Sequence, residues 1–197
     1  MPTRTMLRPT LLALATLALL PNIAHAQNFP GLFTRDDETR LFRFEATTAP
    51  VSLFTNSSAN GGFDPFLSLF DNTGFLIATN DDQSADNPDS LISFDLAPGT
   101  YFLTLSQYEN QPVGPNLTNG FLYTGVADYT NQFALPGGGT APFLNFQGEK
   151  RTGAYNVVFS GVVGGAAEVP EPGAVALAVG TLFAVGGTLL RRRKSSN

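Results

Sequence analysis

Apolar and polar residues alternate along several short segments of this chain. Phe42, Phe44 and Ala46 alternate with Arg43 and Glu45. A period of two that includes aromatic residues predicts a half-buried β-strand. Similar patterns and short apolar runs predict further strands at 51–55, 66–70, 75–79, 92–96, 101–105 and 155–159.

Turn signals lie between these segments. Asp71-Asn72-Thr73-Gly74 separates 66–70 from 75–79, and Ala97-Pro98-Gly99-Thr100 separates 92–96 from 101–105, so each pair is expected to form a hairpin. The segments 112–120 and 136–148 are rich in Gly, Pro and Asn and are expected to be long loops. Short strands at turn-rich intervals predict an all-β fold, a jelly-roll-like β-sandwich at 27–161. Its core is expected to be rich in Phe, since the chain has 17 Phe and no Trp.

The first 26 residues have the pattern of a secretory signal peptide. Arg4 and Arg8 precede the apolar run 11–20, Pro21 follows it, and Ala24-His25-Ala26 supplies a cleavage site. The run is too short to span a bilayer. The Sec translocon and signal peptidase are therefore expected partners.

The C-terminal end has a second targeting pattern. Residues 173–190 carry no charge and as a helix would extend about 27 Å, close to the thickness of a bilayer core. The basic residues 191–194 are expected to stay in the cytoplasm. Small residues at 162–168 suggest a linker before this transmembrane helix. An ordinary membrane anchor is one interpretation.

Val169-Pro170-Glu171-Pro172-Gly173, the apolar helix and the basic end together resemble a PEP-CTERM sorting signal of Gram-negative bacteria, which here would cover 169–197. The resemblance implies that exosortase, a membrane-embedded processing enzyme, recognises the motif Val169, Pro170, Glu171 and Pro172 as a substrate. The helix would then hold the protein in the inner membrane only in transit. The processed protein would reach the cell surface or an extracellular matrix, where exopolysaccharide is an expected partner.

The middle of the chain has a second resemblance. The run 64–71, then Asn80-Asp81-Asp82, then 92–101 with Pro98-Gly99-Thr100-Tyr101, are similar to bacterial pre-peptidase C-terminal domains. These are small β-sandwiches attached to secreted proteins. The resemblance implies a non-catalytic exported module.

Composition excludes several kinds of chemistry. The chain has no Cys, and its one His is His25 in the predicted signal peptide. The mature domain therefore lacks the residues of Ser-His-Asp and Cys-His sites, and of zinc sites built from Cys or His. Residues 27–167 hold 14 acidic and five basic residues, a formal net charge of −9, which disfavours nucleic-acid binding. We expect no enzymatic activity.

The loop from Asn80 to Asp89 is the strongest candidate for a ligand site. Carboxylate and amide oxygens in a flexible loop suit Ca²⁺, although no EF-hand spacing is present. Asp64 and Asp71 approach this loop through the preceding hairpin. A solvated turn in which Asp and Asn cap backbone groups is the alternative. The candidate calcium ligands are Asp71, Asn80, Asp81, Asp82, Asp86 and Asp89.

Two further candidates follow from residue type. Tyr123 and Tyr129 lie in a less regular region, where exposure and stacking on a sugar are expected. The acids of 35–38 could form a glycosidase pair, a chemistry that needs only carboxylates, or simply a charged start to the first strand.

Overall fold

The computed structural model describes residues 26–47, 50–134, 136–162 and 165–169. Apart from Ala26 and Val169, the predicted signal peptide at 1–26 and the predicted sorting signal at 169–197 lie outside these residues. Within the described ranges, no helix is long and apolar enough to cross a membrane. The strands are β1 (Gln27–Leu32), β2 (Thr39–Ala46), β3 (Val51–Thr55), β4 (Pro65–Phe70), β5 (Leu76–Asn80), β6 (Leu91–Phe94), β7 (Gly99–Gln107), β8 (Ala154–Ser160) and β9 (Ala167–Val169).

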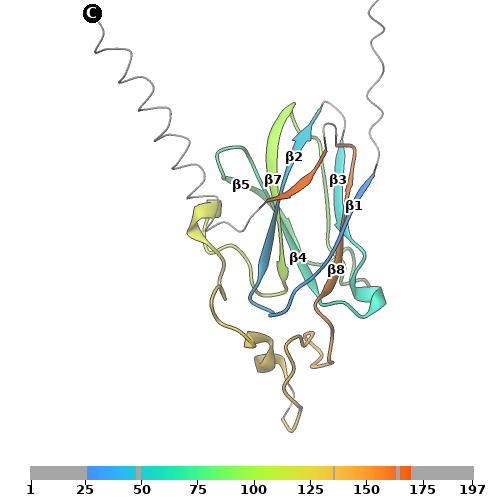
Figure 1. Ribbon diagram of the computed structural model, residues 1–197, viewed down its shortest axis with the longest axis vertical. Coiled ribbons are helices and arrows are strands. Elements are labelled where there is room, and N and C mark those ends of the chain that lie inside the picture. The colour runs from blue at the N-terminus through green and yellow to red at the C-terminus, as the bar shows by residue number, and fades with distance from the viewer. Residues whose placement is uncertain (1–25, 48–49, 135, 163–164, 170–197) are drawn as a thin grey trace, which may run out of the picture.

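The strands form two antiparallel sheets (Figure 1). One has the order β1-β8-β3-β6 and the other β5-β4-β7-β2-β9. The all-β prediction is confirmed, and the arrangement is that of a β-sandwich. Each segment that the sequence predicted as a strand contains one, shifted at its ends by a few residues.

Side chains from both sheets form one core. Alternate residues of each strand point inward, as the pleat requires. Phe159 of β8 lies at its centre, with ring centroids 5.4 to 5.6 Å from Phe29, Phe42 and Phe44. The core also contains Val51, Leu53, Leu67, Leu69, Ile92, Leu103, Leu105, Tyr155 and Val157.

One of the two predicted hairpins is confirmed and the other is wrong. β4 and β5 pair across the turn at 71–74. β6 pairs with β3, however, and β7 pairs with β2 and β4 in the other sheet. The Pro98-Gly99 turn therefore carries the chain from one sheet to the other. Leu96, at this crossing, is buried in the core, which holds the connection across the sandwich.

Strand β1 was not predicted. It pairs with β8 from Gln27 to Leu32, although Pro30 and Gly31 interrupt its apolar pattern. Gly31 lies against the ring of Tyr155, where a Cβ atom would come within 2.2 Å. The close approach of Tyr155 accounts for the glycine.

Strand β9 was also not predicted. Ala167 pairs with Arg43 and Val169 with Leu41, at the edge of the five-stranded sheet. Glu168 forms an ion pair with Arg40, at 3.3 Å from Nε. The expected linker at 162–168 therefore ends in a sheet, and the folded domain reaches Val169, the first residue of the predicted sorting motif.

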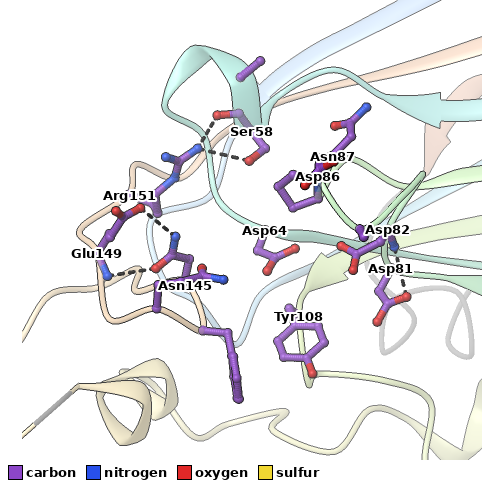
Figure 2. Close-up of a pocket in the computed structure, with 15 residues that line it drawn as sticks. Ser58, Asp64, Asp81, Asp82, Asp86, Asn87, Tyr108, Asn145, Glu149 and Arg151 are labelled. Atoms are coloured by element: carbon purple, nitrogen blue, oxygen red, sulfur yellow. Dashed lines mark hydrogen bonds between the residues drawn. The ribbon is translucent and has the colours of Figure 1, made fainter.

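Part of the long connection from β7 to β8 extends beyond one end of the sandwich, at the bottom of Figure 1. Three short 3₁₀ helices lie in the described loops: η1 (Ser58–Asn60), η2 (Leu117–Asn119) and η3 (Tyr129–Phe133). The long connection from β7 to β8 contains the last two. Its final part, 145–151, faces the segment around η1 (Figure 2).

Candidate binding groove

A groove with a volume of about 580 Å³ opens where β4 begins and where β5 and β7 end. Three segments line it: the η1 region, the β5–β6 loop and residues 145–151 (Figure 2). A volume of this size is in the range that small ligands occupy.

Asp64, directly before β4, lies in the wall of the groove. The residue is 8% exposed, and its Oδ1 atom has no hydrogen-bond partner among the described residues. Its carboxylate points toward that of Asp82 (Figure 2). Burial, and then the charges of Asp82 and Asp81, raise the pKa of Asp64 to about 7. The position of Asp64 is fixed by the backbone, because the Tyr108 amide donates to its carbonyl at 2.7 Å.

The β5–β6 loop supplies the acidic side of the groove. The hydroxyl of Ser90 lies 2.9 Å from the carbonyl oxygen of Asp81 and 2.7 Å from that of Pro65, so its single proton can be donated to either, which ties the loop to the start of β4. The Leu91 amide donates to Oδ1 of Asn80 at 2.7 Å. These bonds leave the side chains of three candidate calcium ligands lining the groove, Asp81, Asp82 and Asp86.

The carboxylates of two other candidate calcium ligands, Asp71 and Asp89, accept hydrogen bonds from backbone amides. Asp71 accepts hydrogen bonds from the amides of Thr73 and Phe75 in the β4–β5 turn, at 2.8 and 2.9 Å. Asp89 is buried and accepts from the Thr55 hydroxyl and the Ser57 amide, at 2.8 and 2.7 Å. Among the described residues, no three acidic side chains form a cluster that could hold a metal ion. Calcium binding stays a prediction.

The segment 145–151 forms the opposite wall. Three hydrogen bonds join Asn145 and Glu149: the Asn145 side-chain amide donates to the Glu149 carboxylate at 3.0 Å, and the backbone amides of Glu149 and Asn145 donate to the Asn145 side chain and the Glu149 carbonyl at 2.8 and 3.1 Å. The guanidinium of Arg151 donates to the carbonyl of Gly62 at 2.9 Å and also to Ser58. Arg151 therefore joins this wall to the η1 region.

Aromatic rings complete the groove. Tyr108 and Phe146 line it, with centroids 6.2 Å apart, and Phe133 lies 6.0 Å from Phe146. Phe146 is 64% exposed, the highest exposure of any large apolar side chain among the described residues. Sequence reasoning missed Phe146 and Arg151, because both lie in an irregular loop with no periodic pattern.

The predicted tyrosine pair lies outside the residues that line the groove. Tyr123 and Tyr129 stack in parallel with centroids 4.0 Å apart. The expected exposure of Tyr129 is wrong: it is 6% exposed, and its hydroxyl donates to the Tyr108 carbonyl at 2.6 Å. Burial raises the pKa of Tyr129. Its ring covers one face of Tyr123, so the pair cannot present two free faces to a sugar.

The acidic start of β2 is a structural anchor. Asp36 is fully buried and accepts three hydrogen bonds, from the Asp128 amide at 2.7 Å, the Thr130 amide at 2.8 Å and the Thr130 hydroxyl at 2.7 Å. The neighbouring Asp37 accepts from the Gly125 amide at 3.0 Å. These bonds hold the start of η3 and thereby position Tyr129, whose hydroxyl donates to the Tyr108 carbonyl.

Comparison with known proteins supports one of the two resemblances. Residues 38–107 match the model of the bacterial pre-peptidase C-terminal domain. The match runs from the start of β2 to the end of β7, so this part of the sandwich is similar to that family. Strands β1, β8 and β9 and the wall at 145–151 lie outside it. No curated protein matches the chain.

Proposed function

We propose that the chain is an exported surface or matrix protein whose β-sandwich is a non-catalytic module that binds extracellular polysaccharide in the groove. The observation that carries the proposal is the exposed ring of Phe146 beside carboxylate and amide side chains. Sugars offer apolar faces that pack on aromatic rings, and hydroxyls that bond to such polar groups. The similarity of 38–107 to a family of accessory modules also supports a binding role.

The route to the outside is part of the same proposal. A signal peptide at 1–26 would direct the chain across the inner membrane, and a transmembrane helix at 173–190 would hold it there. Exosortase would then process the chain at the motif 169–172 and pass it to the cell surface or to an exopolysaccharide layer.

Glycoside hydrolysis is a second candidate function, and Asp64 is the observation that favours it. A carboxyl group with a pKa of about 7 that faces a second carboxylate, that of Asp82, has the properties of a general acid and its partner. Binding alone is the simpler role, because burial already accounts for the raised pKa of Asp64.

The binding proposal can be tested with the full chain in mild detergent, by affinity electrophoresis through the exopolysaccharide of the producing bacterium. The wild type should be retarded. Phe146→Ala should weaken binding by roughly tenfold, which corresponds to the loss of one aromatic contact. Release of reducing ends, measured in parallel, would indicate hydrolysis.

Phe75→Ala is the matched control. Phe75 is also an exposed Phe, but it lies at the β4–β5 turn and does not line the groove. Equal retardation of all three proteins would place any binding outside the groove, and no retardation of the wild type would refute the binding role.

A further inference from the structure

The groove holds more negative charge than its own cations neutralise. Its lining includes five acidic residues, Asp64, Asp81, Asp82, Asp86 and Glu149. Among the described lining residues the single base is Arg151, and its guanidinium already donates to Ser58 and Gly62. A positively charged ligand would therefore be attracted by the groove as a whole.

Asp64 adds a specific site within this field. Its Oδ1 atom is buried and meets no donor among the described residues. A buried acceptor without a partner costs free energy, which a ligand can recover by bringing an N–H group. The carboxylates of Asp64 and Asp82 point toward each other, so an ammonium group between them could donate to both (Figure 2).

The aromatic part of the lining distinguishes an organic cation from a metal ion. Tyr108 lies next to Asp64 and Phe146 belongs to the opposite wall, and aromatic faces attract organic ammonium groups and the C–H face of a sugar. Ca²⁺ instead requires six to eight oxygen ligands, whereas no three acidic side chains of the described residues form such a cluster. A sugar ammonium can contact both the carboxylates and the aromatic rings, whereas a bare metal ion would contact only the carboxylates.

The remaining lining groups suit hydroxyls. Gln147 brings an amide to the groove, Asn87 and Asn145 line it while bonded to Gln83 and Glu149, and its volume of about 580 Å³ is ample for a sugar ring. We infer that the groove binds a sugar with a free amino group, whose ammonium lies between Asp64 and Asp82 and whose ring packs against Phe146. This inference rests on the proposed polysaccharide-binding function and names its ligand class.

Isothermal titration of the full chain in mild detergent tests this inference with three oligosaccharides of equal length. They are a β-1,4-glucosamine tetramer, its N-acetylated form and a β-1,4-glucose tetramer. The free-amine tetramer should bind at least tenfold more tightly than the other two. Asp82→Asn and Asp64→Asn should each remove most of that preference, by roughly tenfold in affinity, because a charged hydrogen bond is lost.

Asp95→Asn is the matched control, since it removes the same charge from an exposed position that does not line the groove. The preference should survive in this variant. Thermal unfolding of each variant checks the fold. If Asp64→Asn does not fold, the inference is tested by Asp82→Asn, because Asp82 is exposed.

The possible failures can be told apart. Equal affinity for the three tetramers would overturn the amine inference and leave polysaccharide binding in place. Binding of none of them would overturn the inference, and loss of exopolysaccharide retardation as well would remove the proposed function. Tight binding of CaCl₂ that Asp82→Asn abolishes would overturn the inference in favour of a metal site.

Discussion

At the scale of single residues, two buried aspartates illustrate opposite uses of a carboxylate. Asp36 has three donors within 2.8 Å, so its burial is compensated inside the protein. Asp64 is nearly as buried, but its Oδ1 atom has no partner in the described chain and its other neighbours include Asp81 and Asp82. The first carboxylate stabilises a loop, and the second leaves bonding capacity for a ligand.

The raised pKa of Asp64 predicts a pH-dependent stability. Folding raises this pKa from an ordinary 3.8 to about 7, so between these pH values the folded state holds a proton that the unfolded state has released. The contribution of protonated Asp64 to the free energy of unfolding is therefore fully present below about pH 4, and it is lost as the pH rises through 7. Asp64→Asn cannot ionise, so its free energy of unfolding relative to wild type should increase from pH 4.5 to pH 7.5, by on the order of a few kcal/mol.

Urea unfolding of both proteins across this range measures the difference. Asp95→Asn, which removes a carboxylate from an exposed position, is the control. A difference for Asp64→Asn that stays constant with pH would show that folding does not raise the pKa of Asp64.

At the scale of elements, most strands can be predicted from the local sequence pattern, whereas the positions of the loops depend on contacts between residues far apart in the sequence. Alternation predicted β2 and β8 because each has one face in the core. The pattern missed β1, which Pro30 and Gly31 interrupt, and β9, whose three residues are too short for a period. Turn residues such as Pro and Gly are found both in hairpins and in connections between two sheets. Pro98-Gly99 therefore could not show that β6 and β7 belong to different sheets.

The groove was only partly predictable for the same reason. Asp81, Asp82 and Asp86 belong to one acidic run that the sequence displays. Phe146 and Arg151 reach the groove through the hydrogen bonds of Arg151 to residues about ninety positions earlier. No local pattern contains that contact.

The segment before η3 should depend on Asp36. Asp36→Ala would leave the amide and hydroxyl of buried Thr130 without their partner, and would also remove the bond from the more exposed Asp128 amide, at a cost of about 3 kcal/mol in the free energy of unfolding. Limited proteolysis should then cut within 124–134 faster than in the wild type. Asp86→Ala, which removes an exposed carboxylate, is the control, and unchanged cleavage in Asp36→Ala would mean that other contacts hold the segment.

At the scale of the whole molecule, the folded module ends where the proposed sorting signal begins, without a spacer. β9 ends at Val169, and the Pro-Glu-Pro sequence begins at the next residue. If exosortase reads this sequence, replacing Pro170 and Glu171 by Ala should leave the chain unprocessed. Immunoblots of membrane fractions should then show accumulation of a species larger than the wild-type product.

Glu168→Ala is the control for that experiment. It removes the neighbouring acid, which lies in β9 and pairs with Arg40, but leaves the motif intact. Normal processing of the Pro170/Glu171 double variant would contradict the assignment of a sorting signal.

The position of β9 also determines how the module responds to tension. A pull on the chain beyond Val169 is transmitted first to the three-residue pairing of β9 with β2. β2 is held on its other side by eight paired residues of β7, so β9 can detach while the rest of the sheet keeps its pairing. A pulling force would therefore detach β9 before it unfolds the sandwich. The released residues would lengthen the connection to the rest of the chain, while the groove keeps its shape.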